Sequence, residues 1–249
     1  MVRDMFREDF DAPELDRSVW LPHYLPAWSS RAATATVYEV RDSCLRLSIP
    51  VSHGLWMPED HPTPLRLSGM QTGNFSGPVG STIGQQPLEG GSVVREEQQT
   101  FWGFTPCYGR LAMRARAVIT PRSMVAWWMV GLEDVPSHSA EICVFEIFGN
   151  AVQPGSAEVG MGFKKFRDPS VAQDFAAPRL PIDVAEFHDY TVDWTEERAE
   201  FLVDNVLIRS CPRPPAYPMQ MMIAVFDFPD GSESAAVPKL VIDHLHQTI

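Results

Sequence analysis

Short segments in which apolar and polar residues alternate recur along most of the chain. The segment 111–119 (LAMRARAVI) places Arg114 and Arg116 on one face and apolar residues on the other, which is typical of a half-buried strand. The segment 125–132 (VAWWMVGL) is apolar on both faces, as expected of a strand buried inside a sandwich. The same reasoning predicts further strands over residues 141–148, 190–194, 199–208, 219–226 and 239–246.

Two segments indicate how these strands are joined. Asp204 and Asn205 separate FLV from VLI, which is typical of a two-residue hairpin turn. The segment 68–99 is rich in Gly, Ser, Gln and Pro and has little periodicity, so we expect long loops there, and loops of that length are commonly functional. No fixed-period repeat or shift in composition divides the chain, so residues 1–249 are expected to form one domain.

Composition supports an all-β fold. The 22 prolines and 16 glycines among 249 residues leave little room for long helices. Apolar residues make up 45% and charged residues 21%, which excludes disordered, collagen-like and coiled-coil chains. Many short strands joined by Gly and Pro turns predict a two-sheet antiparallel β-sandwich.

Charge and cysteine content exclude several classes of partner. A net charge of −12 repels phosphate backbones, so nucleic acid is not an expected partner, whereas a neutral sugar is unaffected. None of the four cysteines lies within a CxxC spacing of another, so a zinc knuckle is not predicted, and four are too few for a disulfide framework.

The first ten residues lack an apolar signal-peptide core, and no stretch is long enough to span a membrane. On this evidence the chain as given is expected to be cytoplasmic. We also expect a monomer.

The segment EICVFE at 141–146 is a candidate catalytic site. In a regular strand Glu146 would point away from Glu141 and into the core, at a cost of several kcal/mol. A β-bulge at Val144 and Phe145 would restore the phase, so that Glu141, Cys143 and Glu146 share one face. Two carboxyl groups so placed would lie about 5–6 Å apart, the separation expected of a retaining glycosidase.

EICVFE also resembles the E-x-D-x-x-E signature of glycoside hydrolase family 16, the laminarinase and lichenase group. The resemblance continues in YGRLAMRAR, in AWWMVG, and in FHDYTVDWTEERAEFLVDNVLIR, which resembles the family's F-H-x-Y…W-T…V-D-G hairpin. The opening FREDFDAPELDRSVW and the closing VPKLVIDHLH also match in order and spacing. The resemblance implies a β-jelly roll with a carbohydrate cleft on its concave sheet.

By this resemblance, Glu141 is the nucleophile and Glu146 is the general acid/base. The middle position of the signature is usually Asp, but here it is Cys143, whose neutral thiol is a weak hydrogen-bonding group without negative charge. This departure leaves both essential carboxylates in place and is expected to affect the rate. A second departure is Lys164 and Lys165, near a position where laminarinase-like members usually carry a His.

Three tryptophans are candidate sugar-binding residues, because the apolar C–H faces of sugar rings stack on aromatic side chains. Trp127 and Trp128 are adjacent, so one is expected in the core and the other in the cleft. Trp128 resembles the family's recurrent Trp, and Trp194 resembles another Trp of the concave sheet, although core packing is nearly as good an interpretation for Trp194.

The sequence does not predict a complete metal-binding site. His244 and His246 would share a strand face at a spacing that could hold a metal, but no third ligand is evident. Asp243 resembles a closing-strand Asp that helps to hold a structural calcium in many family members, although a solvated surface Asp explains it equally well. No cofactor is otherwise expected.

Two functions follow from these observations. The first is endo-acting hydrolysis of a β-linked polysaccharide, a β-glucan or galactan, with retention of configuration. A transglycosylase would use the same steps with a sugar as acceptor. The second is a lectin-like module that keeps the fold and the cleft but has lost the chemistry. The sequence does not distinguish among the glycans.

Overall fold

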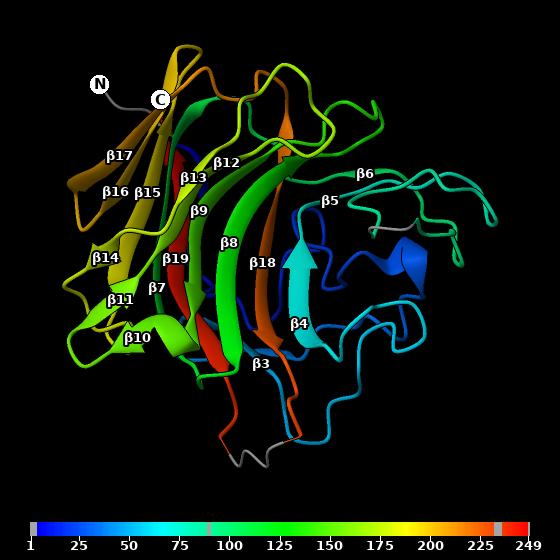
Figure 1. Ribbon diagram of the computed structural model, residues 1–249, viewed down its shortest axis with the longest axis horizontal. Coiled ribbons are helices and arrows are strands. Elements are labelled where there is room, and N and C mark those ends of the chain that lie inside the picture. Colours follow the sequence, from blue (N-terminus) through cyan, green and yellow to red (C-terminus); the bar gives the residue numbers. More distant parts are fainter. Residues whose placement is uncertain (1–3, 89–90, 232–235, 249) are drawn as a thin grey trace.

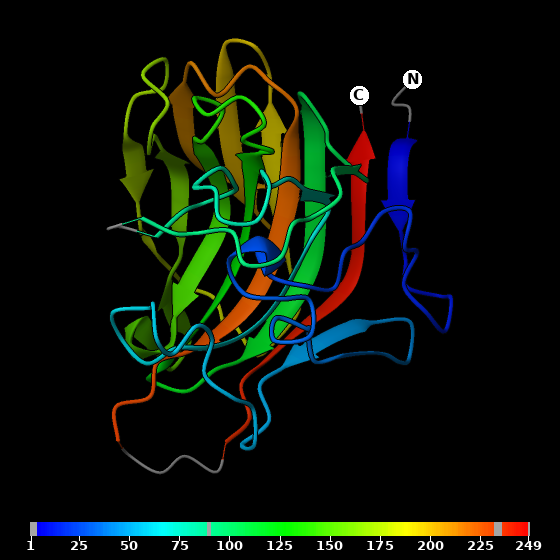
Figure 2. The same cartoon turned by 90° about the vertical axis from the view of Figure 1, so that its right-hand side faces the viewer.

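The computed structural model describes residues 4–88, 91–231 and 236–248, and almost all of its regular structure is antiparallel strand. Two large sheets pack face to face, which confirms the predicted two-sheet sandwich (Figures 1 and 2). None of the helices in these ranges approaches the length or apolar character needed to cross a bilayer.

The first large sheet has eight strands in the order β17-β16-β15-β7-β19-β3-β2, with β1 also paired to β19. Their bounds are β1 Asp4–Glu8, β2 Tyr38–Val40, β3 Leu45–Ser48, β7 Gly109–Val118, β15 His188–Trp194, β16 Arg198–Val203, β17 Val206–Pro212 and β19 Lys239–Thr248.

The second large sheet has six strands in the order β13-β12-β9-β8-β18-β4 and lies in front of the first in Figure 1. Its strands are β4 Arg66–Gln71, β8 Ser123–Gly131, β9 Glu141–Phe148, β12 Gly160–Lys164, β13 Asp174–Ala176 and β18 Met219–Asp227.

The remaining elements are short. They are two 3₁₀ turns, η1 Pro26–Trp28 and η2 Gly149–Ala151, a two-stranded sheet of β5 Gly73–Asn74 and β6 Phe101–Trp102, and a three-stranded sheet of β10 Val152–Gln153, β11 Ser156–Glu158 and β14 Arg179–Leu180.

The alternation of apolar and polar residues in the sequence predicts which side chains of a strand face the core and which face outward. In β7 the apolar residues Met113, Ala115 and Ala117 lie in the core between the sheets, and Arg114 and Arg116, which alternate with them, are only partly buried. All nine residues of β8 are buried, as predicted, because loops cover the outer face of the six-stranded sheet. Asp204 and Asn205 both have positive φ angles (49° and 62°), as the predicted hairpin turn between β16 and β17 requires.

The expectation of loops throughout 68–99 is wrong for the beginning of that segment. Residues 68–71 belong to β4, an edge strand of the six-stranded sheet that pairs with β18. Polar side chains are tolerated there because each finds a buried partner. Ser68 Oγ accepts a hydrogen bond from the Val37 backbone, and Gln71 Oε1 accepts one from the Leu25 backbone. Most of the rest of the segment consists of loops, as expected.

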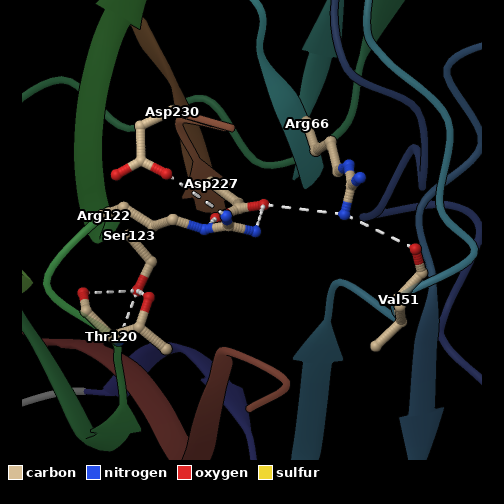
Figure 3. Close-up of polar contacts among 7 residues, drawn as sticks. All are labelled: Val51, Arg66, Thr120, Arg122, Ser123, Asp227 and Asp230. Atoms are coloured by element: carbon tan, nitrogen blue, oxygen red, sulfur yellow. Dashed lines mark hydrogen bonds and ion pairs between the residues drawn. The ribbon is translucent and has the colours of Figure 1, made fainter. Parts of the chain in front are cut away.

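A buried ion pair connects neighbouring strands at one end of the six-stranded sheet (Figure 3). Arg122, just before β8, contacts both carboxylate oxygens of Asp227 at 2.8 and 3.2 Å, and Asp227 ends β18. Arg66, which begins β4, approaches the same carboxylate at 3.8 Å. Three neighbouring strands are therefore linked through one carboxylate at the same end of the sheet.

Candidate active site

The pairing of β8 with β9 contains the bulge that the sequence predicted. Trp127 pairs with Phe145 and Trp128 pairs with Cys143, so that Val144 is the extra residue on β9. The pairing of β9 with β12 is also irregular at this point. The extra residue of β9 therefore shifts its pairing register with both neighbouring strands.

The bulge turns both glutamates toward the same face of the sheet. Glu141, Cys143 and Glu146 line a single cavity, whereas Ile142 and Ile147 lie in the core between the sheets. This is the phase predicted from the sequence, and it removes the cost of placing a carboxylate in the core.

The cavity is small, about 150 Å³, and lies against the outer face of the six-stranded sheet. Its residues come from four strands and from loops that precede β4, follow β5 and follow β12. The lining residues are Tyr24, Gln86, Met124, Ala126, Trp128, Glu141, Cys143, Glu146, Lys164, Phe166 and Phe226.

Glu141 is buried at one end of this cavity, and burial raises its pKa to about 7. The positive charge of Lys164 opposes this shift, the negative charge of Glu146 adds to it, and a hydrogen bond from Gln86 Nε2 to Glu141 Oε1 opposes it. Near neutral pH, therefore, this carboxyl group is present in both protonation states.

Glu146 is held by a lysine that comes from the neighbouring strand. Lys164 Nζ lies 2.7 Å from Glu146 Oε2, and the ammonium group also lies 4.8 Å from the centre of the Phe175 ring. Burial lowers the pKa of Lys164, but the nearby carboxyl groups of Glu141 and Glu146 outweigh burial, so its pKa is raised. Lys164 therefore remains an ammonium ion.

Cys143 lies between the two glutamates and is almost fully buried. Its sulfur lies 3.7 Å from the carbonyl oxygen of Gly160, which accepts a weak hydrogen bond. Burial raises the pKa of this thiol well above its ordinary value, and the charges of Glu146 and Glu141 add to the shift while Lys164 opposes it. A neutral thiol therefore occupies this position, so a nucleophilic thiolate is not supported.

Of the three tryptophans predicted to bind sugar, only Trp128 lines the cavity. The prediction is wrong for Trp127, whose ring is buried between the sheets and packs edge-on against Phe145 at 6.2 Å. It is also wrong for Trp194, which lies in the same core and donates its indole N–H to the carbonyl oxygen of Pro215 at 3.1 Å. Neither buried ring can stack against a bound sugar.

Asp243 is paired with an arginine side chain. Arg114 Nε lies 3.2 Å from its carboxylate, and a guanidinium group at that distance competes with a cation. Calcium takes six to eight oxygen ligands. Among residues 4–88, 91–231 and 236–248, no three His, Cys, Asp or Glu side chains gather as a potential metal site.

Several cavity residues were not identified from the sequence. Tyr24 and Phe226 have no motif around them. Gln86 lies in the Gly- and Ser-rich segment that was expected to be functional, but nothing in its local pattern distinguishes it from the other glutamines there. Lys164 was noticed only as a departure from the family, and its contact with Glu146 follows from strand register.

Comparison with solved structures shows the same fold in several glycanases. An endo-β-galactosidase from Clostridium perfringens, described as releasing GlcNAcα1-4Gal, is 23% identical with a TM-score of 0.86 over 99% of this chain and 62% of its own length. The chain thus spans less than two thirds of that enzyme. The catalytic domain of an endo-1,3-β-glucanase (laminarinase) from Thermotoga petrophila RKU-1 is 16% identical with a TM-score of 0.71, and the match covers 100% of this chain and 98% of that one.

The family assignment depends on sequence as well as fold. No curated protein sequence matches the chain significantly. The profile of glycosyl hydrolases family 16 matches residues 97–244, which is more than half of the chain and includes the bulged strand with both glutamates. The chain therefore belongs to glycosyl hydrolases family 16, whose members act on O-glycosyl bonds.

Proposed function

We propose that this protein is an endo-acting hydrolase that cleaves a β-linked polysaccharide of the glucan or galactan class with retention of configuration. The observation that supports the proposal most strongly is the bulge, because it brings Glu141 and Glu146 into one cavity on the sheet face. Residues so spaced on a strand suit a retaining mechanism, which uses two carboxyl groups about 5–5.5 Å apart.

In the proposed mechanism the two carboxyl groups have different roles. Glu141 attacks the anomeric carbon as a carboxylate while protonated Glu146 transfers its proton to the leaving glycosidic oxygen. Glu146 then removes a proton from water, which attacks the glycosyl-enzyme and releases the sugar with its original configuration. No cofactor takes part. The charge of Lys164 helps to keep Glu141 ionised.

The proposal is tested by assaying reducing-sugar release from laminarin, lichenan, agarose and galactan. We expect activity on at least one of them, with Glu141→Gln and Glu146→Gln each lowering it by several orders of magnitude. Glu158→Gln is the matched control, because Glu158 is a partly exposed glutamate that pairs with Arg179 on β14 and lies outside the cavity. Near-normal turnover in either cavity variant would refute the roles assigned to these residues.

A lectin-like module is the second candidate, and one observation favours it. Lys164 Nζ lies 2.7 Å from Glu146 Oε2, so the side chain assigned as the acid/base is engaged in an ion pair within the cavity. Binding of one of the four polysaccharides with no release of reducing sugar by the wild-type protein would support this alternative.

A further inference from the structure

A second, larger cavity adjoins the one that contains the glutamates. Its volume is about 640 Å³, and it shares Tyr24, Gln86, Met124, Phe166 and Phe226 with the smaller cavity. The two cavities therefore lie side by side and share part of their wall.

The wall of the larger cavity is mainly aromatic. Tyr24 and Trp56 pack edge to face with their ring centres 5.5 Å apart, and Phe226 and Phe228 stack at 6.4 Å. Three of these rings are largely covered by their neighbours. Phe166 differs, because 58% of its surface is exposed although it lines both cavities. An apolar ring left open at this position is available to a ligand.

The backbone at Phe166 is strained. Its φ angle is +44°, in the left-handed region that bulky residues rarely adopt. Gln86 (φ +43°) and Glu133 (φ +62°) line the same cavity and share this property. Strained backbone of this kind costs on the order of 1–3 kcal/mol per residue and tends to concentrate at functional sites.

Contacts on the C-terminal side of Phe166 hold its loop in place. The guanidinium group of Arg167 pairs with the buried carboxylate of Glu133, and its backbone N–H donates to Ser139 Oγ at 3.0 Å. Buried Asp168 accepts a hydrogen bond from the Tyr217 hydroxyl at 2.8 Å.

The same loop is linked to both glutamates of the small cavity. Lys164, two residues before Phe166, pairs with Glu146. On the other side, the Gln86 backbone N–H donates to Glu133 Oε1 at 2.7 Å, while its side chain donates to Glu141. The contacts that position the two carboxyl groups therefore also position the loop that carries Phe166.

We propose that Phe166 is a binding platform on which the C–H face of a neutral pyranose stacks, in a subsite next to the bond that is cleaved. The loop between β12 and β13 holds the ring in the binding position before the sugar arrives, so little conformational entropy is lost on binding. This proposal rests on the proposed function in one respect, because it assumes that the ligand is a saccharide.

The test compares Phe166→Ala, Phe166→Asn and Phe166→Trp with wild type. Asn tolerates a positive φ angle, so Phe166→Asn removes the ring without backbone strain. Trp102→Ala is the control, because Trp102 is 47% exposed and lines neither cavity. On the polysaccharide that is hydrolysed best, we expect KM to rise about tenfold in the Ala and Asn variants, with kcat within about twofold of wild type.

Phe166→Trp is expected to restore KM, and Trp102→Ala is expected to change neither parameter. A purely structural role would instead lower the melting temperature and kcat together. Unchanged KM in both the Ala and the Asn variant would overturn the proposal.

If the wild type binds laminarin or galactan without hydrolysing it, the proposed function fails. The Phe166 platform is then tested by affinity electrophoresis on that polysaccharide in place of KM. If it neither binds nor hydrolyses any of the four, both proposals fail.

Discussion

At the scale of single residues, the site is defined by a row of three side chains and one opposing charge. Glu141, Cys143 and Glu146 follow one another along β9, and Lys164 faces them from β12. Only two of the three β9 side chains can become carboxylates, and the thiol between them stays neutral. The charge on Glu141 therefore depends on Glu146 and on the lysine.

Cys143→Asp is predicted to raise turnover about tenfold if the missing carboxylate limits the rate, which corresponds to roughly 1.4 kcal/mol. A third negative charge would favour the protonated form of its neighbours and move the acid limb of the kcat/KM profile to higher pH. The new carboxylate would also face the Gly160 carbonyl oxygen, which accepts from the thiol at present. Turnover and melting temperature should therefore be measured on the same preparation. A folded variant that is no faster on any of the four polysaccharides would show that the missing Asp is not limiting.

Lys164→Met is predicted to move the acid limb of the kcat/KM profile to higher pH. Lys164 lowers the pKa of Glu141, and without it the effects of burial and of Glu146 are less opposed, so the nucleophile ionises at higher pH. Lys164→Arg should restore the profile because it keeps the positive charge. Lys165→Met is the control, since Lys165 is exposed and lines neither cavity. An unshifted acid limb in Lys164→Met would argue against this electrostatic role.

At the scale of elements, the bulged strand depends on the glycines of its neighbour β12. Gly160 pairs with Glu146 and Gly162 pairs with Cys143. Gly162 has a φ angle of +124°, and a Cβ atom at this position would overlap the carbonyl oxygen of Asp174 on β13. The close approach of three strands behind the glutamates therefore requires glycine at this position.

Gly162→Ala is predicted to destabilise the protein by at least about 2 kcal/mol, through backbone strain and the clash together. Gly155→Ala is the matched comparison, because Gly155 also has a positive φ angle (+71°) but faces open space. Its loss should be about 1 kcal/mol, and urea denaturation measures both. Equal losses in the two variants would show that the clash with β13 is relieved without cost.

At the scale of the whole molecule, the loops of the N-terminal hundred residues turn an open sheet face into an enclosed site. These loops gather beside β4, on the right in Figure 1, and they contribute Tyr24, Trp56 and Gln86 to the two cavities. Their packing is what buries Glu141, so folding of the entire chain is linked to the protonation of one carboxyl group.

Stability is predicted to fall as pH rises from about 4.5 to about 7 through the titration of Glu141. Burial raises its folded-state pKa to about 7 from the ordinary value of 4.5, so in this range the folded chain keeps a proton that the unfolded chain releases. The whole effect is at most about 3 kcal/mol. Glu141→Gln lacks this titration. Its melting temperature minus that of wild type should therefore increase between pH 4.5 and pH 8. A constant difference for Glu141→Gln would contradict the raised pKa.

The order of residues was sufficient to predict the fold class, most strands of the two large sheets, the hairpin turn at Asp204 and Asn205, and the face to which Glu141 and Glu146 point. These features depend on the order of residues within one segment. The period of a strand is two, and an acidic residue that would otherwise enter the core reveals a bulge in that strand.

The tertiary structure alone decided what surrounds the two glutamates. Lys164 reaches Glu146 because β12 pairs with β9, and Gln86 reaches Glu141 because a loop folds back over the sheet. Trp127 and Trp128 have the same pattern in sequence, and only the pairing of β8 directs Trp128 to the cavity. The physical reason is that burial, charge and strand register act between segments far apart in the chain, whereas periodicity reports only on neighbours along it.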